Sequence, residues 1–260
     1  MKDRPRAVAP PPGATTTIFH DGRRDLVAVE EPLELRCEGE AIAVTMRTPG
    51  HDEELALGFL YGEGLIDRPH RAGLTADLAA NTIEIEGPLL RELTARRFYT
   101  TSSCGVCGKG AIDEVTVACA PLPPGPALPR ELLASLPERL VQPGFERTGG
   151  LHASGLFDRE GELICVREDV GRHNALDKVV GWALGEGMLP FHEQLLCVSG
   201  RLSFELVQKA AVAGAPILVG VGAPTSLAVE LARDRGLTLC GFARQGRMNV
   251  YSGAERIAAP

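Results

Sequence analysis

The second half of the chain alternates short apolar runs with amphipathic stretches of about a dozen residues. Apolar runs of this length are typical of buried strands, and the amphipathic stretches are typical of helices. The expected elements are a hairpin (152–158 and 162–167), a helix over 172–184, a strand over 195–198, a helix over 203–212, a strand over 216–221, a helix over 225–235 and a strand over 237–242. Strands that alternate with helices predict βαβ crossovers and a largely parallel sheet.

The first half is richer in strand patterns. Residues 15–46 predict strands, with a hairpin turn at 38–40, and Asp52-Glu53-Glu54 opens a helix. A further short strand is expected over 81–86. A proline-rich segment then predicts a hinge, because it can neither hold a helix nor donate to a sheet. The chain therefore divides into a disordered arm (1–14), a smaller β-rich N-terminal subdomain (15–120), a linker (121–129) and a larger α/β domain (130–260).

The composition narrows the class of protein. Of the 260 residues 44 % are hydrophobic and 23 % charged, as in ordinary globular chains. The net charge of −7 argues against a protein that coats nucleic acid or an anionic membrane. No apolar run approaches the roughly 20 residues of a membrane helix. The first residues lack the apolar stretch of a signal peptide, so none is expected. Seven cysteines, an odd number with one close pair, favour a reducing cytoplasm over a secreted disulfide framework.

That close pair is Cys104 and Cys107, in the glycine-bearing loop 100–110. Two thiols at this spacing can share a metal, form a disulfide or hand sulfur between them, and Lys109 favours the reactive thiolate. A structural zinc needs four ligands, and no second close Cys or His pair exists, so no metal site is expected. A thioredoxin-like pair would open a helix, which the glycines disfavour. Ordinary cysteines in a turn remain an alternative, and the other five are expected to be small buried hydrophobes.

A second group of candidates lies where the expected strands end. Arg172 and His173 follow one strand, Gly200-Arg201-Leu202-Ser203 follows the next, and Thr225 follows the third. Free N–H groups and the positive ends of helices make such turns anion sites, and in an open parallel sheet they share the carboxyl edge. Guanidinium groups in Phe242–Asn249 add to this charge, so a phosphorylated ligand is favoured over plain helix capping. His152 could lie beside that edge, but a lone histidine is more often structural.

Taken together, these motifs resemble one family, the formate dehydrogenase accessory sulfurtransferases. The resemblance follows the family's order from residue 31 to residue 251 and is highly specific. The matching segments are 31–35, 45–52, 55–64, 102–109, 148–152, 167–178, 199–205, 223–228 and 241–251.

The resemblance implies a concrete activity. Such proteins accept sulfur from a cysteine desulfurase as a persulfide on the Cys-x-x-Cys loop. They pass it to the molybdenum cofactor, a bis(molybdopterin guanine dinucleotide), before that cofactor enters formate dehydrogenase. Cys104 and Cys107 would then be the sulfur carriers, with a slight preference for Cys104. The residues expected to bind the cofactor, or a guanine nucleotide that mimics it, are Arg172, His173, Asn174, Lys178, Arg201, Thr225, Phe242, Ala243, Arg244, Gln245, Gly246 and Arg247.

The resemblance also implies a homodimer, and a three-layer larger domain similar to the cytidine deaminase fold. Zinc deaminases need a His or Cys with a nearby Glu on one helix and Cys-x-x-Cys on the next. Here the two helices begin Gly171-Arg172-His173-Asn174 and Gly200-Arg201-Leu202-Ser203, so deamination is disfavoured. Two alternatives to sulfur transfer stay open: a non-catalytic chaperone for the cofactor and its target enzyme, and a dithiol redox enzyme.

Overall fold

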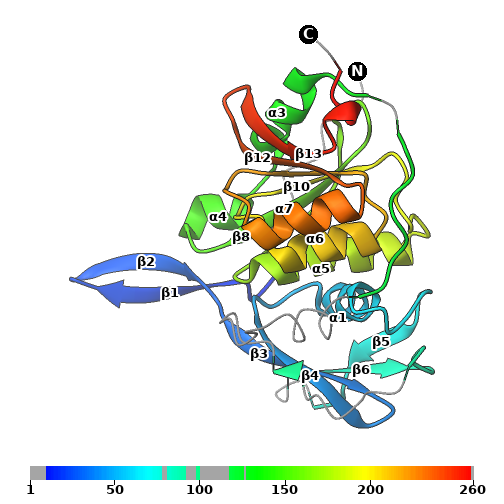
Figure 1. Ribbon diagram of the computed structural model, residues 1–260. Coiled ribbons are helices and arrows are strands. Elements are labelled where there is room, and N and C mark those ends of the chain that lie inside the picture. Colours follow the sequence, from blue (N-terminus) through cyan, green and yellow to red (C-terminus); the bar gives the residue numbers. More distant parts are fainter. Residues whose placement is uncertain (1–9, 78–80, 92–97, 100–116, 126, 259–260) are drawn as a thin grey trace.

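The computed structural model describes residues 10–77, 81–91, 98–99, 117–125 and 127–258. The Cys104–Cys107 pair and the predicted loop around it lie outside these residues. The described strands form sheets of six, five and two strands. Figure 1 shows the six-stranded sheet with its helices above the five-stranded sheet, and the two-stranded sheet projecting to one side.

The six-stranded sheet belongs to the second half of the chain. Its order is β13-β12-β11-β10-β8-β9. The bounds are β8 His152–Phe157, β9 Leu163–Asp169, β10 Leu195–Val198, β11 Ile217–Gly220, β12 Thr238–Arg244 and β13 Arg247–Ser252. Only β10, β11 and β12 pair in parallel, whereas the β8–β9, β8–β10 and β12–β13 pairs are antiparallel. The prediction of a largely parallel sheet is therefore wrong: a hairpin at each end of the order makes it mixed.

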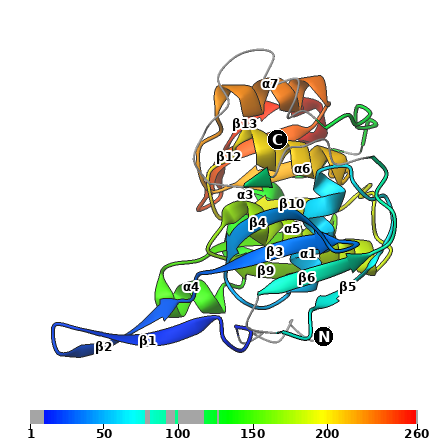
Figure 2. The ribbon, with the colours of Figure 1, turned by 90° about the horizontal axis from the view of Figure 1, so that it is seen from below.

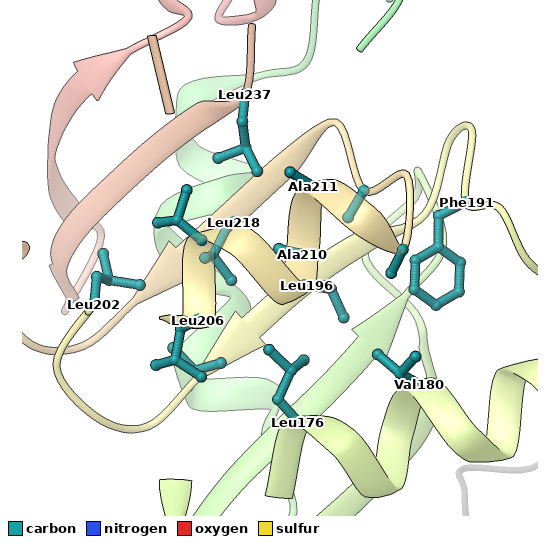
Figure 3. Packing of buried hydrophobic residues seen from close by; sticks show 14 of the residues in the cluster. Leu176, Val180, Phe191, Leu196, Leu202, Leu206, Ala210, Ala211, Leu218 and Leu237 are labelled. Carbon is teal, nitrogen blue, oxygen red and sulfur yellow. The ribbon is translucent and has the colours of Figure 1, made fainter. Parts of the chain in front are cut away.

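Helices cover both faces of this sheet, which gives three layers. On one face lie α5 (Arg172–Gly185), α6 (Phe204–Val212) and α7 (Ser226–Asp234), and on the other lies α3 (Arg130–Arg139). Figure 3 shows how the first face is filled: α5 contributes Leu176 and α6 contributes Leu206, while Leu196 and Leu218 come from the strands below. The three layers agree with the sequence analysis, and likeness to the cytidine deaminase fold stays a prediction.

The first half forms a mixed five-stranded sheet on one helix. The sheet order is β5-β6-β3-β4-β7. The bounds are β3 Glu31–Cys37, β4 Glu40–Arg47, α1 Asp52–Gly62, β5 Arg71–Leu74, β6 Thr82–Glu86 and β7 Phe98–Tyr99. The hairpin, the helix and the strand near residue 82 were expected, and all three are present. The strands β1 (Thr15–His20) and β2 (Arg23–Ala28) form a separate hairpin that projects from the body (Figure 2).

Helix α1 joins the two halves because it packs directly on α5. A Cβ atom at Gly58 of α1 would lie 1.8 Å from the backbone oxygen of Asp177, and one at Gly181 of α5 would lie 1.8 Å from that of Glu54. The two backbones therefore touch where only glycine fits. Beside this crossing, Arg167 of β9 donates from Nη2 to the Glu54 carboxylate at 2.8 Å.

Two segments of the second half differ from the simplest expectation. Residues 242–249 were expected to follow the last strand. Instead, β12 continues to Arg244, and β13 pairs back on it through a two-residue turn at Gln245 and Gly246. Both turn residues have positive φ, which matches the twist of a hairpin. The proline-rich linker runs along the second half: Leu122 N–H donates to the Arg235 carbonyl at 2.8 Å. Helix α3, the short α4 (Pro143–Thr148) and the 3-10 turn Ala254–Arg256 were not predicted.

Candidate functional site

The turns at the carboxyl edge of the six-stranded sheet are joined by backbone hydrogen bonds. Gly222, after β11, donates from its N–H to the Gly200 carbonyl after β10 at 3.0 Å. Phe242 of β12 donates in turn to the Gly222 carbonyl at 3.1 Å. A Cβ atom at Gly222 would lie 2.8 Å from the Gly200 oxygen, so glycine permits this close approach. Two of the three turns that were expected to share one edge, those after β10 and β11, are therefore neighbours in the structure, and β12 lies beside the second.

Positive charge gathers at one end of this edge, around His152. His152 begins β8 and lies opposite Asp169, the last residue of β9. A Cβ atom at Gly200 would lie 3.4 Å from His152 Nδ1 and 3.7 Å from Arg172 Cδ, so both side chains flank the same turn. Burial, and then the nearby charges of Arg172, His173 and Arg201, lower the pKa of His152, against the opposing effect of Asp169. This end of the edge is thus built to receive negative charge.

Arg172 and Arg201 carry the fixed charge of this cluster. Arg201 is exposed, and Arg172 is partly buried with its Nε atom unpaired. Within the described part of the chain, neither guanidinium forms an ion pair with a carboxylate. Gly171 is the N-cap residue of α5. No side chain at this position accepts a hydrogen bond from the first free N–H groups of the helix. Guanidinium groups and an uncapped helix start are the donors that phosphate binds.

His173 connects the starts of α5 and α6. Its Nε2 atom lies 3.0 Å from Ser203 Oγ and 2.9 Å from Glu205 Oε2. The hydrogen bond and charge of His173 lower the pKa of Glu205. The imidazole of His173 therefore connects the two helix starts. It lies near His152, as do the guanidinium groups of Arg172 and Arg201.

Two of the predicted ligand residues have side chains that point into the protein. Asn174 is buried, donates to the Met46 carbonyl at 2.7 Å and lies 3.2 Å from Thr45 Oγ1. Lys178 is 1 % exposed and pairs with Asp169 Oδ2 at 2.7 Å. The structure thus brings Arg172, His173 and Arg201 together but places these two residues in the contact between the halves of the chain.

The remaining predicted residues are spread along the edge. Thr225 is the N-cap of α7 and accepts a bond from the Ala228 N–H at 3.3 Å. Phe242 is exposed with φ of 53°, an uncommon backbone conformation for an aromatic residue. Ala243 is buried in the core on the α3 face. At the tip of the β12–β13 hairpin, Arg244, Gly246 and Arg247 are exposed. The tip contacts α3, because the Gln245 N–H donates to Glu138 Oε1 at 2.6 Å.

His152 was expected to be structural, whereas it lies among the cations of the edge. A lone histidine gives little signal by itself. The signal that could have found it is its place in a predicted hairpin: the strand that begins with it runs antiparallel to its neighbour, so its first residue lies at the carboxyl ends of the others.

The five cysteines that the structure describes are unsuited to nucleophilic chemistry. Cys37, Cys165, Cys197 and Cys240 are buried and Cys119 is half-buried, close to the expectation. Burial raises the pKa of all five, for Cys165 and Cys240 to about 12. Thiols with raised pKa carry little thiolate at neutral pH, so these five are disfavoured as nucleophiles.

Among the described residues, no group of three or more His, Cys, Asp or Glu side chains is placed to hold a metal ion. No helix in the described ranges is both long and apolar enough to span a membrane.

The fold and the edge define a three-layer α/β protein with a cation-lined carboxyl edge, joined to a second sheet through α1. The chain belongs to the FdhD/NarQ family, whose model matches residues 28–258. This match confirms the family resemblance drawn from the motifs.

Curated relatives and a solved structure agree with this family. A sulfur carrier protein FdhD of Streptomyces avermitilis is 52 % identical over 91 % of this chain and 90 % of its own length. Another protein of that name, from Anaeromyxobacter dehalogenans, is 46 % identical over 99 % of this chain and 98 % of its own. A crystal structure from Desulfotalea psychrophila, of a protein proposed in its description to be a formate dehydrogenase accessory protein, superimposes with a TM-score of 0.74 at 28 % identity. It covers 94 % of this chain and 98 % of its own.

Proposed function

We propose that this protein is a sulfur carrier in the maturation of formate dehydrogenase. In this proposal a cysteine desulfurase supplies sulfur, which is held as a persulfide on Cys104 or Cys107. The protein passes the sulfur to a molybdenum cofactor, a bis(molybdopterin guanine dinucleotide), which it binds as substrate. The names of the relatives, sulfur carrier and formate dehydrogenase accessory protein, support the general role.

The observation that carries the proposal is the state of the other thiols. The chain has seven cysteines. Burial raises the pKa of the five described ones, which suppresses the thiolate that sulfur transfer requires. Cys104 and Cys107 are the two that remain. Lys109 is close to them in the sequence, and a nearby lysine favours the thiolate form. A sulfur carrier in this chain would therefore use that pair.

The spacing of two cysteines suits the electron balance of the transfer. The first thiolate attacks the outer sulfur of the desulfurase persulfide, a new S–S bond forms, and the desulfurase thiolate leaves. Delivery of sulfur as hydrosulfide needs two electrons. The second thiolate supplies them when it attacks the inner sulfur, because HS⁻ then leaves toward the cofactor and a Cys104–Cys107 disulfide remains. A cellular dithiol reductant restores the pair.

The cofactor is proposed to bind at the carboxyl edge. Arg172 and Arg201 would hold its phosphate groups, and the exposed ring of Phe242 offers a surface on which a guanine base can stack. Exposed Arg244 and Arg247 add charge at the hairpin tip. A guanine nucleotide should therefore bind as a partial mimic of the cofactor.

The chain is long enough to bring the thiols to this edge. Val117 N–H donates to Gln208 Oε1 of α6 at 3.0 Å, and Gln208 lies five residues after Ser203. Five helical residues rise about 7.5 Å, so Val117 is close to the start of α6. Cys107 precedes Val117 by ten positions, and ten residue steps can span up to roughly 35 Å when extended.

The test of sulfur transfer is a mass shift on one peptide. The protein is incubated with cysteine and a cysteine desulfurase, thiols are alkylated, and trypsin releases residues 98–109, which carry only Cys104 and Cys107. The expected result is a gain of one sulfur atom that a reductant removes. Fragmentation and the Cys104→Ser and Cys107→Ser variants identify the carrier, while Cys119→Ser is the matched control and should load normally.

Other outcomes discriminate between the alternatives. If an active desulfurase adds no sulfur to this peptide, sulfur transfer by this route is wrong and the chaperone function is favoured. A Cys104–Cys107 disulfide that turns over disulfide substrates without sulfur uptake would favour the redox enzyme. The double Cys→Ser variant should keep its affinity for guanosine diphosphate, because the edge and the thiols act separately.

A further inference from the structure

His152 stands out because its imidazole is available to a ligand. The residue is partly buried at the start of β8, on the same edge as the turns after β10 and β11. The ring makes no hydrogen bond to any described residue, whereas His173, its neighbour, bonds to Ser203 and Glu205. Its nitrogens are not among the buried unpaired side-chain atoms of the described residues, so they reach solvent, where a ligand can meet them.

The charges around this ring come from three elements. Arg172 and His173 face it from α5, Arg201 from the turn after β10, and Asp169 from β9. Positive groups outweigh the one carboxylate, and Asp169 is already engaged with Lys178 at 2.7 Å. Burial and these cations lower the pKa of His152, so the ring is neutral at pH 7 while no anion is bound.

We propose that His152 is a third binding residue of the edge, which takes up a proton from solvent when a phosphate group binds between Arg172 and Arg201. The inference rests on the proposed function, because it assigns a role within the same anion site. The ligand class is a tetrahedral dianion, here the phosphate of a nucleotide. Bound anion, protonated imidazole and two guanidinium groups then bring two negative charges against three positive ones.

The physical reason is a reversal of the local field. Without an anion, a proton on His152 adds a third positive charge to a partly buried cluster and is disfavoured. A dianion within about 4–6 Å reverses this preference, and opposite charges at that distance raise a pKa by about one unit or more. By linkage, the anion then binds about tenfold more tightly when His152 is protonated than when it is neutral.

The experiment follows the imidazole itself in the full-length protein. Nuclear magnetic resonance spectra of the six histidines are recorded from pH 5 to 8.5, with and without saturating sulfate. Sulfate is the probe because it is a tetrahedral dianion that does not titrate in this range. The signal that disappears in His152→Gln is assigned to His152. We expect its pKa to lie below 6.5 in the free protein and to rise by about one unit with sulfate.

The control and the variant separate two kinds of failure. His192 is exposed and precedes β10, so it lies at the opposite edge, and its signals should not move when sulfate is added at constant pH. Guanosine diphosphate should bind His152→Gln several-fold more weakly than wild type at pH 6, and His192→Gln like wild type. If sulfate or the nucleotide binds but leaves the His152 pKa unmoved, the inference is wrong and the anion site stands. If neither binds between pH 5.5 and 8, the anion site itself is wrong, and the inference falls with it.

Discussion

At the scale of single residues, Asp177 is the clearest case of an unfavourable buried charge. It is 2 % exposed on α5, and burial raises its pKa to about 6 although Lys209 Nζ lies 2.9 Å away. The folded state therefore holds a proton on Asp177 that the unfolded state releases near pH 4. Stability from this group is present below pH 4 and is lost as the pH rises toward 6.

Asp177→Asn tests this pH dependence. The amide keeps the shape but does not titrate, so the free energy of unfolding of wild type minus that of the variant should fall by about 2–3 kcal/mol between pH 4 and 6.5. Urea unfolding at several pH values measures it. Asp234→Asn, an exposed aspartate of α7, should show a flat difference. A difference that rises with pH would mean that pairing with Lys209 outweighs burial.

Individual site residues were predicted unevenly, and the reason is geometric. The turn positions of Arg172 and Arg201 follow from strand ends that the sequence pattern marks clearly. Asn174 and Lys178 lie four residues apart on α5, next to His173, but α5 is covered by the first half of the chain. Periodicity cannot reveal a neighbour so distant in sequence. The Cys104–Cys107 pair was found by its spacing, and its geometry stays a prediction.

At the scale of elements, the crossing of α1 and α5 depends on two glycines. A Cβ atom at Gly181 would lie 1.8 Å from the Glu54 oxygen, so Gly181→Ala must push the helices apart. We expect it to lower the free energy of unfolding by about 3 kcal/mol, the upper end of what overpacking usually costs. Gly185→Ala on the same helix meets no atom within 4 Å, and the better helix propensity of alanine should leave stability unchanged or raise it by up to about 1 kcal/mol.

Urea unfolding of both variants at neutral pH supplies the measurement. Equal effects of the two substitutions would contradict the close crossing, because helix propensity alone would then explain them. Retention of wild-type stability by Gly181→Ala would mean that the helices do not touch there.

The elements that were missed lacked local signals. The turn between β12 and β13 is Gln245-Gly246, which adopts the geometry usually marked by Asn-Gly or Asp-Gly. Helix α3 contains Pro137, which argues against a helix in any local reading. The strands and helices that were found have strong local signals: β10 is a short apolar run, and α6 is amphipathic. The direction in which the strands pair has no local signal in the sequence. This is why a largely parallel sheet was predicted although the sheet is mixed.

At the scale of the whole molecule, the two halves share buried polar contacts. Asp169 Oδ2 accepts bonds from the Thr48 N–H at 3.1 Å and from Lys178 at 2.7 Å, and Lys178 also donates to the Thr48 carbonyl at 2.9 Å. Arg167 pairs with Glu54 nearby. The proline-rich linker suggested two subdomains hinged at 121–129, whereas these contacts between residues more than a hundred positions apart could not be predicted from local composition.

Because these contacts cross between the halves, we expect the halves to unfold as one cooperative unit. The most protected amides of β3 and β10 should exchange hydrogen with the same opening free energy. Asp169→Ala leaves Lys178 buried without its carboxylate and should lower both values together by about 3–5 kcal/mol. Glu193→Ala removes one member of an exposed pair with Arg159 and should lower them by less than about 1 kcal/mol.

Hydrogen exchange read by mass spectrometry or by nuclear magnetic resonance measures both strands at once. Opening of β3 well before β10 in the wild type, or a loss confined to one half in Asp169→Ala, would show instead that the linker separates two independently folding units.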